Sequence, residues 1–303
     1  MLGLMLWVMA LLSACSAPNA PVSRLDLNHR LQALLPADAI LLGEQHDNAD
    51  HQRIQREVVT LLAARSALTA LVIEMAVADT STAKLARTAG EAEVKTALNW
   101  DDKAWPWATY APAVMAAVQG GVPVVGANLP RTSLRAAMAN SALEARLDAA
   151  TLQRQNQQIR EGHCDLLPAS QIAPMTRVQI ARDVAMADSV GRAVTQAAQA
   201  GGAPLGKTVV LIAGSGHVDK TLGVARHLAS AITSKSVLLA ASDSGVDAAS
   251  SAGFDAVWPT LPAPKKDYCA ELRKSMSSRA QASISTLSSV DTRALTATSV
   301  DVG

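Results

Sequence analysis

Aromatic residues are scarce in this chain of 303 residues, in which five Trp, two Tyr and one Phe make up only 3%. The core must therefore be aliphatic, because 49% of the residues are nevertheless hydrophobic. Modules that stack nucleic-acid bases on aromatic rings do not fit this composition. Net charge is also small, since 27 Lys and Arg stand against 26 Asp and Glu. The sequence thus gives no electrostatic reason to expect a nucleic-acid partner.

Several common functional motifs are missing as well. The three cysteines show no CxxC spacing, so structural zinc is not expected. No G-x-S-x-G element is present, which leaves a serine-hydrolase elbow unsupported. The glycines at Gly214 and Gly216 do not complete a GxGxxG loop, and no Walker lysine follows them. Their small size more plausibly allows a sharp turn of the backbone.

The chain begins with an apolar stretch, residues 1–12, that is too short to span a bilayer comfortably. The small residues after it, leading into Cys15, resemble the bacterial lipobox, in which the cysteine receives lipid. No Lys or Arg precedes the stretch, which departs from that pattern, and an ordinary secretory signal is the alternative. We expect a signal peptide over 1–14, then a lipidated Cys15 and tether over 15–24. The protein would be anchored to the cell envelope, at the outer membrane, and would face the periplasm.

The two other cysteines, Cys164 and Cys269, form an isolated pair in a chain that we expect to be exported. Such pairs are more often disulfide-bonded than free in an oxidising compartment. We therefore predict a bridge that ties the helical middle of the chain to its C-terminal end. Residues 277–303 are rich in Ser, Thr and Ala, and we expect them to form a disordered tail.

Short apolar runs alternate with amphipathic segments over residues 25–276, which we interpret as one domain. The predicted strands cover 39–43, 70–74, 122–126 and 207–213, with later candidates at 237–240 and 256–258. The predicted helices include Ala49–Ala64, Thr80–Leu98 and Val218–Ser230. This alternation is typical of an α/β fold with a mainly parallel β-sheet flanked by helices. Residues from about 130 to 200 lack a strand pattern and predict a smaller all-helical subdomain.

Polar side chains follow the predicted strands at the points where the strands end. Parallel strands joined by right-handed crossovers have their carboxyl ends at one edge of the sheet, where open α/β sheets build their sites. Four of these ends carry the residues Glu44 and His46, Glu74, Asn128, and His217. We therefore expect these five side chains to lie together as a candidate site.

This set of side chains permits more than one chemistry. Imidazole and carboxylate groups can ligate zinc, manganese or iron, and they can also act as general acid and base. The residues with either capacity are Glu44, His46, Glu74 and His217. Purely structural roles remain possible for the neighbouring residues. Asp47 could cap the following helix, His51 could lie on a solvated face, and Asn128 could form a turn.

A series of short motifs resembles the ChaN family of haem-binding uptake lipoproteins. The first is Leu42-Gly-Glu-Gln-His-Asp-Asn48, with His51 and Gln55 beyond it. The later ones follow in the family's order: Trp107-Ala-Thr-Tyr-Ala-Pro112, Gly126-Ala-Asn-Leu-Pro-Arg131, Gly162-His-Cys164, Gln179-Ile-Ala-Arg-Asp183, Met186-Ala187 and Ala213-Gly-Ser-Gly-His217. The resemblance covers nearly everything from about residue 38 to residue 270.

The resemblance implies a lipid-anchored protein that binds haem in iron acquisition. In the family, tyrosine contacts the iron, while histidine and lysine contact the propionates. This chain has only Tyr110 and Tyr268, and none between residues 132 and 162. The haem-binding residues that we expect are Tyr110, His163, His46 and His217. The family also suggests two partners, an outer-membrane haem receptor and a second copy of the chain bridged by the ligand.

The same fold family is similar to erythromycin-esterase-like and Tiki-type proteins, which carry Glu and His at these strand ends. Those relatives imply an alternative function, an exported hydrolase that acts on esters or peptides. It would be metal-dependent or assisted by Glu and His, through Glu44, His46, Glu74 and His217. A structural role, in which these groups only stabilise the strand ends, has no positive observation in its favour.

Overall fold

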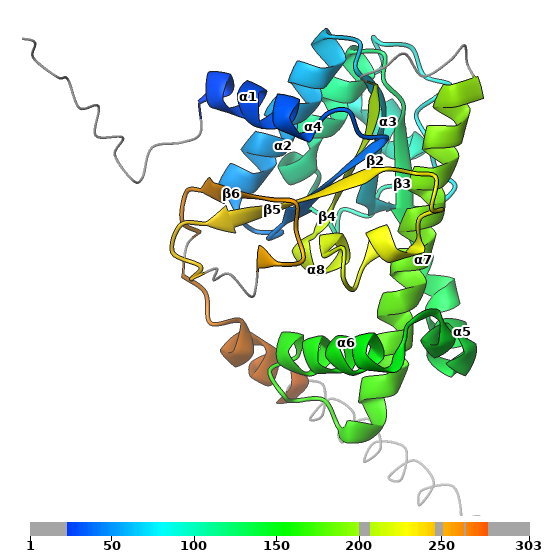
Figure 1. Cartoon of the computed structure of the whole chain (residues 1–303), viewed down its shortest axis with the longest axis vertical. Helices are drawn as coiled ribbons and strands as arrows, with labels where there is room; N and C mark the ends of the chain where they lie inside the picture. The colour runs from blue at the N-terminus through cyan, green and yellow to red at the C-terminus, as the bar shows by residue number, and fades with distance from the viewer. Residues whose placement is uncertain (1–22, 200–206, 246–250, 264, 278–303) are drawn as a thin grey trace, which may run out of the picture.

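The computed structural model describes residues 23–199, 207–245, 251–263 and 265–277 (Figure 1). The six strands of its sheet are all parallel and lie in the order β3-β2-β4-β1-β5-β6. They are β1 (Ala39–Glu44), β2 (Leu68–Val77), β3 (Val124–Asn128), β4 (Thr208–Gly214), β5 (Ser234–Ala241) and β6 (Ala256–Thr260). The predicted α/β fold with a parallel sheet flanked by helices is therefore confirmed.

Helices connect these strands. The α-helices are α1 (Arg24–Leu34), α2 (Ala49–Ala64), α3 (Glu91–Ala97), α4 (Trp107–Gln119), α5 (Leu134–Ala139), α6 (Ala149–Gly162), α7 (Ala169–Gln199) and α8 (Ser215–Val218). Short 3₁₀ turns are η1 (Arg131–Ser133), η2 (Ser141–Arg146) and η3 (Val224–His227). None of the helices in the described part of the chain is long and apolar enough to cross a membrane.

The sheet is buried on both faces, because successive side chains of a strand point to opposite sides. Ile40 and Leu42 of β1 belong to a large aliphatic core shared with α1, α2 and α4. Ala39 and Leu41 point the other way, into a second core shared with α7. Figure 1 shows α1, α2 and α4 on one side of the sheet and α7 on the other. Burial on both faces explains why β1 reads as an unbroken apolar run.

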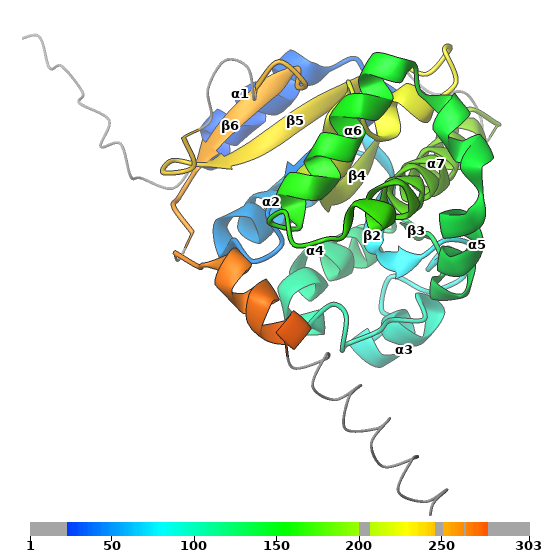
Figure 2. The same cartoon turned by 90° about the horizontal axis from the view of Figure 1, so that it is seen from below.

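Residues 131–199, all of which the structure describes, contain helices but no strand. The long helix α7 joins this helical part to the sheet. Its C-terminal half buries Met186, Ala187 and Val190 in the second core, while α5, α6 and η2 pack along the same helix. Helix α7 contacts β2, β3 and β4, whereas α6 lies beyond the strand ends in Figure 1 and crosses in front of the strands in the view from below in Figure 2.

Two predicted helices are wrong in extent. Of Thr80–Leu98, only α3 is helical, because Ser81 forms an antiparallel bridge to Val125 and holds the preceding loop against β3. The predicted helix Val218–Ser230 is replaced by the end of α8 and the turn η3. There a side chain at Gly223 would collide with the carbonyl group of His217, so the chain turns closely at this point.

The predicted Cys164–Cys269 disulfide is present, with 5.6 Å between the two Cα atoms. It ties the end of α6 to a helix over residues 268–277, and the two helices lie side by side in Figure 1. Ser277, which we expected to begin a disordered tail, is the last residue of this helix. The predicted signal peptide, Cys15 and residues 278–303 lie outside the described residues.

The C-terminal helix is mostly exposed, so the disulfide is its principal attachment to the rest of the protein. We expect Cys269→Ser, and equally Cys164→Ser, to accelerate limited proteolysis within residues 265–277. The thermal unfolding temperature of the sheet core should change little, because neither cysteine packs in it. Mass spectrometry of timed digests checks this. An unchanged cleavage rate in both variants would contradict it.

Candidate functional site

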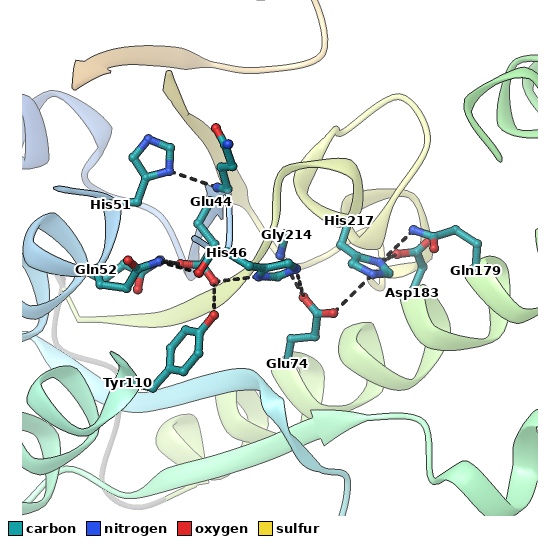
Figure 3. Close-up of polar contacts among 12 residues, drawn as sticks. Glu44, His46, His51, Gln52, Glu74, Tyr110, Gln179, Asp183, Gly214 and His217 are labelled. Atoms are coloured by element: carbon teal, nitrogen blue, oxygen red, sulfur yellow. Dashed lines mark hydrogen bonds and ion pairs between the residues drawn. The ribbon is translucent and has the colours of Figure 1, made fainter. Parts of the chain in front are cut away.

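Four of the five predicted residues, Glu44, His46, Glu74 and His217, meet at one edge of the sheet (Figure 3). Asn128 lines a hollow together with three of them. Glu44 is the last residue of β1, which pairs in register with the end of β4. His217 lies in α8, directly after β4. Glu74 lies within β2, where the pairing register with β3 shifts between Ile73 and Val77. His46 follows β1 and approaches both glutamates.

The buried Glu44 carboxylate organises one half of this site. It is only 1% exposed and accepts hydrogen bonds from four side chains. Tyr110 Oη and His46 Nδ1 each lie 2.8 Å from Glu44 Oε1. The side-chain amides of Gln52 and Gln55 lie 2.8 and 2.6 Å from Glu44 Oε2. With both oxygens occupied, Glu44 positions its neighbours and has little capacity left for a metal.

His46 is held in one orientation but remains open to solvent. Its side chain is 41% exposed, and its ring contacts Trp105 edge-on with 4.9 Å between the ring centroids. Because Nδ1 faces Glu44, Nε2 points toward Glu74 Oε2 across 4.0 Å, beyond hydrogen-bonding distance. Burial opposes charging of this ring, but the Glu44 hydrogen bond and the charges of Glu74 and Glu44 outweigh it and raise the pKa of His46.

Gly214 allows this close arrangement. A Cβ atom at Gly214 would lie 3.0 Å from His46 Nε2 and 3.7 Å from Glu74 Oε2. Its backbone N–H also donates a hydrogen bond of 2.8 Å to Glu74 Oε2. Gly214 therefore leaves room for His46 beside Glu74, a role that goes beyond the sharp turn predicted from the sequence.

A second imidazole–carboxylate pair forms the other half of the site. His217 Nδ1 lies 2.5 Å from Asp183 Oδ1 and 3.0 Å from the side-chain amide of Gln179, while Nε2 lies 3.6 Å from Glu74 Oε1. Burial lowers the tendency of His217 to charge, but Asp183 and Glu74 outweigh it and raise the pKa of His217. Burial raises the pKa of Asp183 to about 6. Burial also opposes ionisation of Glu74, yet both histidines hold the pKa of Glu74 low.

Two of the purely structural roles considered for neighbouring residues are wrong. Asp47 does not cap α2, because the side chain of Asn48 accepts the hydrogen bond from the Asp50 N–H group instead. His51 is not on a solvated face but fully buried. Its Nδ1 accepts from the Gln45 N–H group and its Nε2 lies 2.9 Å from a threonine hydroxyl of β6. Burial lowers the pKa of His51 to about 4, so the ring is a neutral support.

Two of the expected haem-binding residues are poorly placed to contact iron. Tyr110 is buried and its hydroxyl group donates to Glu44, and burial together with that carboxylate raises its pKa. A phenolate is therefore disfavoured, and Tyr110 supports Glu44. His163 lies at the end of α6, where Nδ1 is 2.7 Å from the carbonyl oxygen of Ile159. It lines none of the hollows around His46.

The described residues hold no group of three or more His, Cys, Asp or Glu side chains arranged to bind a metal ion. The reason is that the candidate ligand atoms face one another. Nδ1 of His46 and of His217 each face a carboxylate, and Glu74 accepts a backbone hydrogen bond. The geometry thus gives no support to a preformed zinc or manganese site at Glu44, His46, Glu74 and His217.

Three hollows meet at His46. One, of about 680 Å³, lies between α2 and the start of α4 and is walled by Trp105, Pro106 and the ring of Tyr110. The second, of about 620 Å³, is lined by His217 and Tyr268. The third, of about 840 Å³, is lined by Glu74, His217 and Asn128 among others. His46 is therefore accessible to a ligand from several sides.

The sequence did not identify several residues of the site as functional candidates. Asp183 and Gln179 were quoted only within a family motif, although their spacing of four residues places both on one face of a helix. Gln52 and Gln55 gave a weaker signal, as polar residues on the inner side of an amphipathic helix. Tyr268 is 46% exposed, and its hydroxyl group donates to Asp47 across 2.7 Å. Its place beside the site follows from the disulfide and could not be read from local sequence.

Comparison with protein families assigns most of the chain. The family described as "Haem-binding uptake, Tiki superfamily, ChaN" matches residues 30–228. The chain belongs to this family. The resemblance noted from the motifs is thereby confirmed. A comparison with curated proteins gives no match.

A solved structure agrees with the fold of this ChaN-family protein. The structure titled "Cofacial heme binding to ChaN of Campylobacter jejuni" is 24% identical, with a TM-score of 0.58, and the match covers 73% of this chain and 87% of the other. The type III effector HopBA1 is 17% identical with a TM-score of 0.49, covering 78% of this chain and 93% of the other. At this identity the first match supports the fold alone.

The Asp183–His217 pair should make the stability of the protein depend on pH. The pKa of His217 is raised above 6.5, so its pairing stabilises the fold below that pH, and the stabilisation is lost as pH rises through the raised pKa. Asp183→Asn removes the facing charge, so we expect the pKa of His217 to fall, as measured by NMR titration of its ring protons. Asp188→Asn, on the same helix, is the matched control. An unchanged His217 pKa in Asp183→Asn would contradict the role of the pair.

Proposed function

We propose that the protein binds haem in the cleft around His46 and that Nε2 of His46 ligates the iron. Membership of the haem-binding uptake family supports a haem ligand. Haem is also named as the ligand in the similar structure from Campylobacter jejuni. The observation that carries the proposal is a half-exposed imidazole, fixed through Nδ1, that lines all three hollows.

The hydrogen bond to Glu44 suits His46 to this role. Haem iron binds imidazole through an unprotonated nitrogen. With its proton on Nδ1 facing Glu44, the neutral ring presents Nε2 as the free nitrogen. A carboxylate behind the opposite ring nitrogen fixes the tautomer and makes the ligating nitrogen more basic. Glu44 is itself held by Tyr110, Gln52 and Gln55, so the ring is oriented before a ligand arrives.

The walls of the cleft suit the flat, apolar face of a porphyrin. Trp105 contacts His46 and lines two of the three hollows, together with Ala104. Ligand pockets in proteins are mostly apolar with a few oriented polar groups. The hollow between α2 and the start of α4 combines apolar walls of this kind with a single half-exposed imidazole.

A hemin titration of the purified protein tests the proposal. We expect a saturable shift of the Soret band that His46→Ala weakens about 10- to 100-fold, because the iron loses its nitrogen ligand. Protons compete for Nε2, so affinity should fall as pH falls through the raised pKa of His46. Light scattering with and without hemin tests whether the ligand bridges two copies, which would double the mass.

Matched variants separate His46 from the other candidates. His163→Ala should leave the titration unchanged, because that residue lies outside the hollows around His46. Tyr268→Phe should keep the position of the Soret band, because this hydroxyl group is bonded to Asp47 and Gln45. Loss of the band in Tyr268→Phe but not in His46→Ala would show that Tyr268, and not His46, is the iron ligand. No saturable shift in the wild type would refute haem binding.

A hydrolase is the second candidate, and one specific observation favours it. His217 has Asp183 at Nδ1 and turns Nε2 toward Glu74, which is the backing that a general base or acid requires. Of the two hydrolase mechanisms, we prefer the one assisted by Glu and His, since the described residues hold no preformed group of metal ligands. Such an enzyme would cleave an ester or peptide reached through the hollow that His217 shares with His46.

Chromogenic carboxylic esters and peptides test this candidate. Hydrolysis above the uncatalysed rate should be lost in His217→Ala and strongly reduced in Asp183→Asn, while His163→Ala serves as the control. Elemental analysis tests the metal-dependent form, which predicts bound zinc or manganese that is lost in His46→Ala and His217→Ala. Hydrolysis that persists unchanged in His217→Ala would exclude this residue as the catalytic group.

We further propose that the protein is anchored by a lipid on Cys15, at the outer membrane facing the periplasm, and serves iron acquisition with an outer-membrane haem receptor. The lipobox-like sequence and the family support this proposal. Cys15→Ser should move the protein from the membrane fraction to the soluble fraction, and mass spectrometry should find acyl chains on the wild-type cysteine. Equal membrane association of both forms would contradict the anchor.

A further inference from the structure

Arg182 is a cation at the site with no bonded partner. It lies on α7, directly before Asp183, and is partly buried. Its Nε atom is buried without a hydrogen-bond partner, and its side chain makes no hydrogen bond or ion pair with any other described residue. A guanidinium group presents five N–H donors in a fixed fork, and leaving buried donors unpaired is costly. The arrangement therefore suits an acceptor supplied by a ligand.

The surroundings of Arg182 indicate where that acceptor would lie. Arg182 lines the hollow of about 840 Å³ together with His46 and His217. Two acids also line this hollow, but both are engaged. Glu74 accepts from the backbone of β4 and faces both histidines, and Asp101 pairs with Arg131 across 3.7 Å. Arg182 is thus the cation of this hollow that remains available to an anion.

The other basic side chains near His46 are less suitable. Arg53 and Arg56 line the hollow on the opposite side, beside α2. Arg53 has a buried Nη2 atom without a hydrogen-bond partner, but its charge is already paired with Asp50, whose Oδ1 lies 2.6 Å from Arg53 Nε. Arg56 is exposed to solvent. Asn128, in the hollow of Arg182, has a buried side-chain oxygen without a partner. That oxygen only accepts hydrogen bonds and cannot pair with an anion, so the donors for a carboxylate come from Arg182.

We infer that Arg182 binds a carboxylate of the ligand and so orients a planar aromatic acid whose ring system reaches His46. The inference rests on the proposed function and deepens it, because haem carries two propionate groups. The planar fork of arginine matches a carboxylate through two parallel hydrogen bonds. Arg182 is a positioning residue in this assignment, and His46 remains the iron ligand.

A purely structural role for Arg182 makes a different prediction. Its charge favours ionisation of both Glu74 and Asp183, although burial still raises the pKa of Asp183. If this were its only role, removal of the charge would disturb the binding of every ligand equally. A carboxylate anchor instead discriminates between an acid and its ester, and this difference can be measured.

Metal-free protoporphyrin IX and its dimethyl ester provide the comparison, because neither depends on iron ligation. Binding is followed by quenching of tryptophan fluorescence. We expect the wild type to prefer the diacid and Arg182→Gln to lose about tenfold in diacid affinity, equivalent to about 1.4 kcal/mol, with the ester unaffected. Arg182→Lys should keep part of the preference, because it retains the charge without the fork. Arg192→Gln, on the same helix and paired with Asp79, is the matched control.

Three results would overturn the inference while leaving haem binding intact. The first is a wild-type preference for the diacid that Arg182→Gln retains. The second is an equal loss of acid and ester binding in Arg182→Gln, which identifies a structural counter-charge. The third is loss of the preference in Arg56→Gln instead, which places the carboxylate in the other hollow.

If the wild type binds neither hemin nor protoporphyrin, the proposed function fails, and the carboxylate site is judged separately. The NMR signal of the Arg182 side-chain Nε–H group is then followed during titration with 2-naphthoate and with its methyl ester. A shift caused by the acid alone supports a carboxylate site at Arg182. No shift with either compound overturns it.

Discussion

The buried Glu44 carboxylate is the interaction on which the site depends. A carboxylate removed from water is tolerated only where hydrogen bonds replace its hydration. Here four donors from α2, α4 and the loop after β1 supply them. The same bonds orient His46 and connect the helices on one side of the sheet to the end of β1. The Glu44 carboxylate therefore both holds these elements together and sets the direction of His46 Nε2.

The carboxylate of Glu74 lies between the imidazoles of His46 and His217 and offers a negative charge to both. His46 Nε2 and His217 Nε2 approach different oxygens of Glu74, at 4.0 and 3.6 Å. Each imidazole also has its own carboxylate at Nδ1, Glu44 or Asp183. The two halves differ in exposure, because His46 is half-open while His217 is buried. This difference is the reason for proposing ligand contact at His46 and an electrostatic or acid–base role for His217.

The helical part and the C-terminal segment complete the surroundings of this site. One half of helix α7 is buried against the sheet. The other half carries Gln179, Arg182 and Asp183 to the strand ends. The disulfide holds the last described helix beside α6, and Tyr268 on that helix contacts Asp47. Elements distant in sequence therefore converge on the loop after β1. A ligand in the cleft would contact parts of both the sheet and the helical part.

The sequence by itself determined the parallel α/β fold, the strand ends that carry the site, and the pairing of Cys164 with Cys269. These follow from local pattern, because strands buried on both faces read as apolar runs and their ends share one edge. Only the tertiary structure decided that His51 is buried, that Tyr110 supports Glu44, and that Asp183 and Arg182 reach the site. The physical reason is that their roles depend on which helix face meets the sheet. Packing between distant elements fixes that contact, and local periodicity does not.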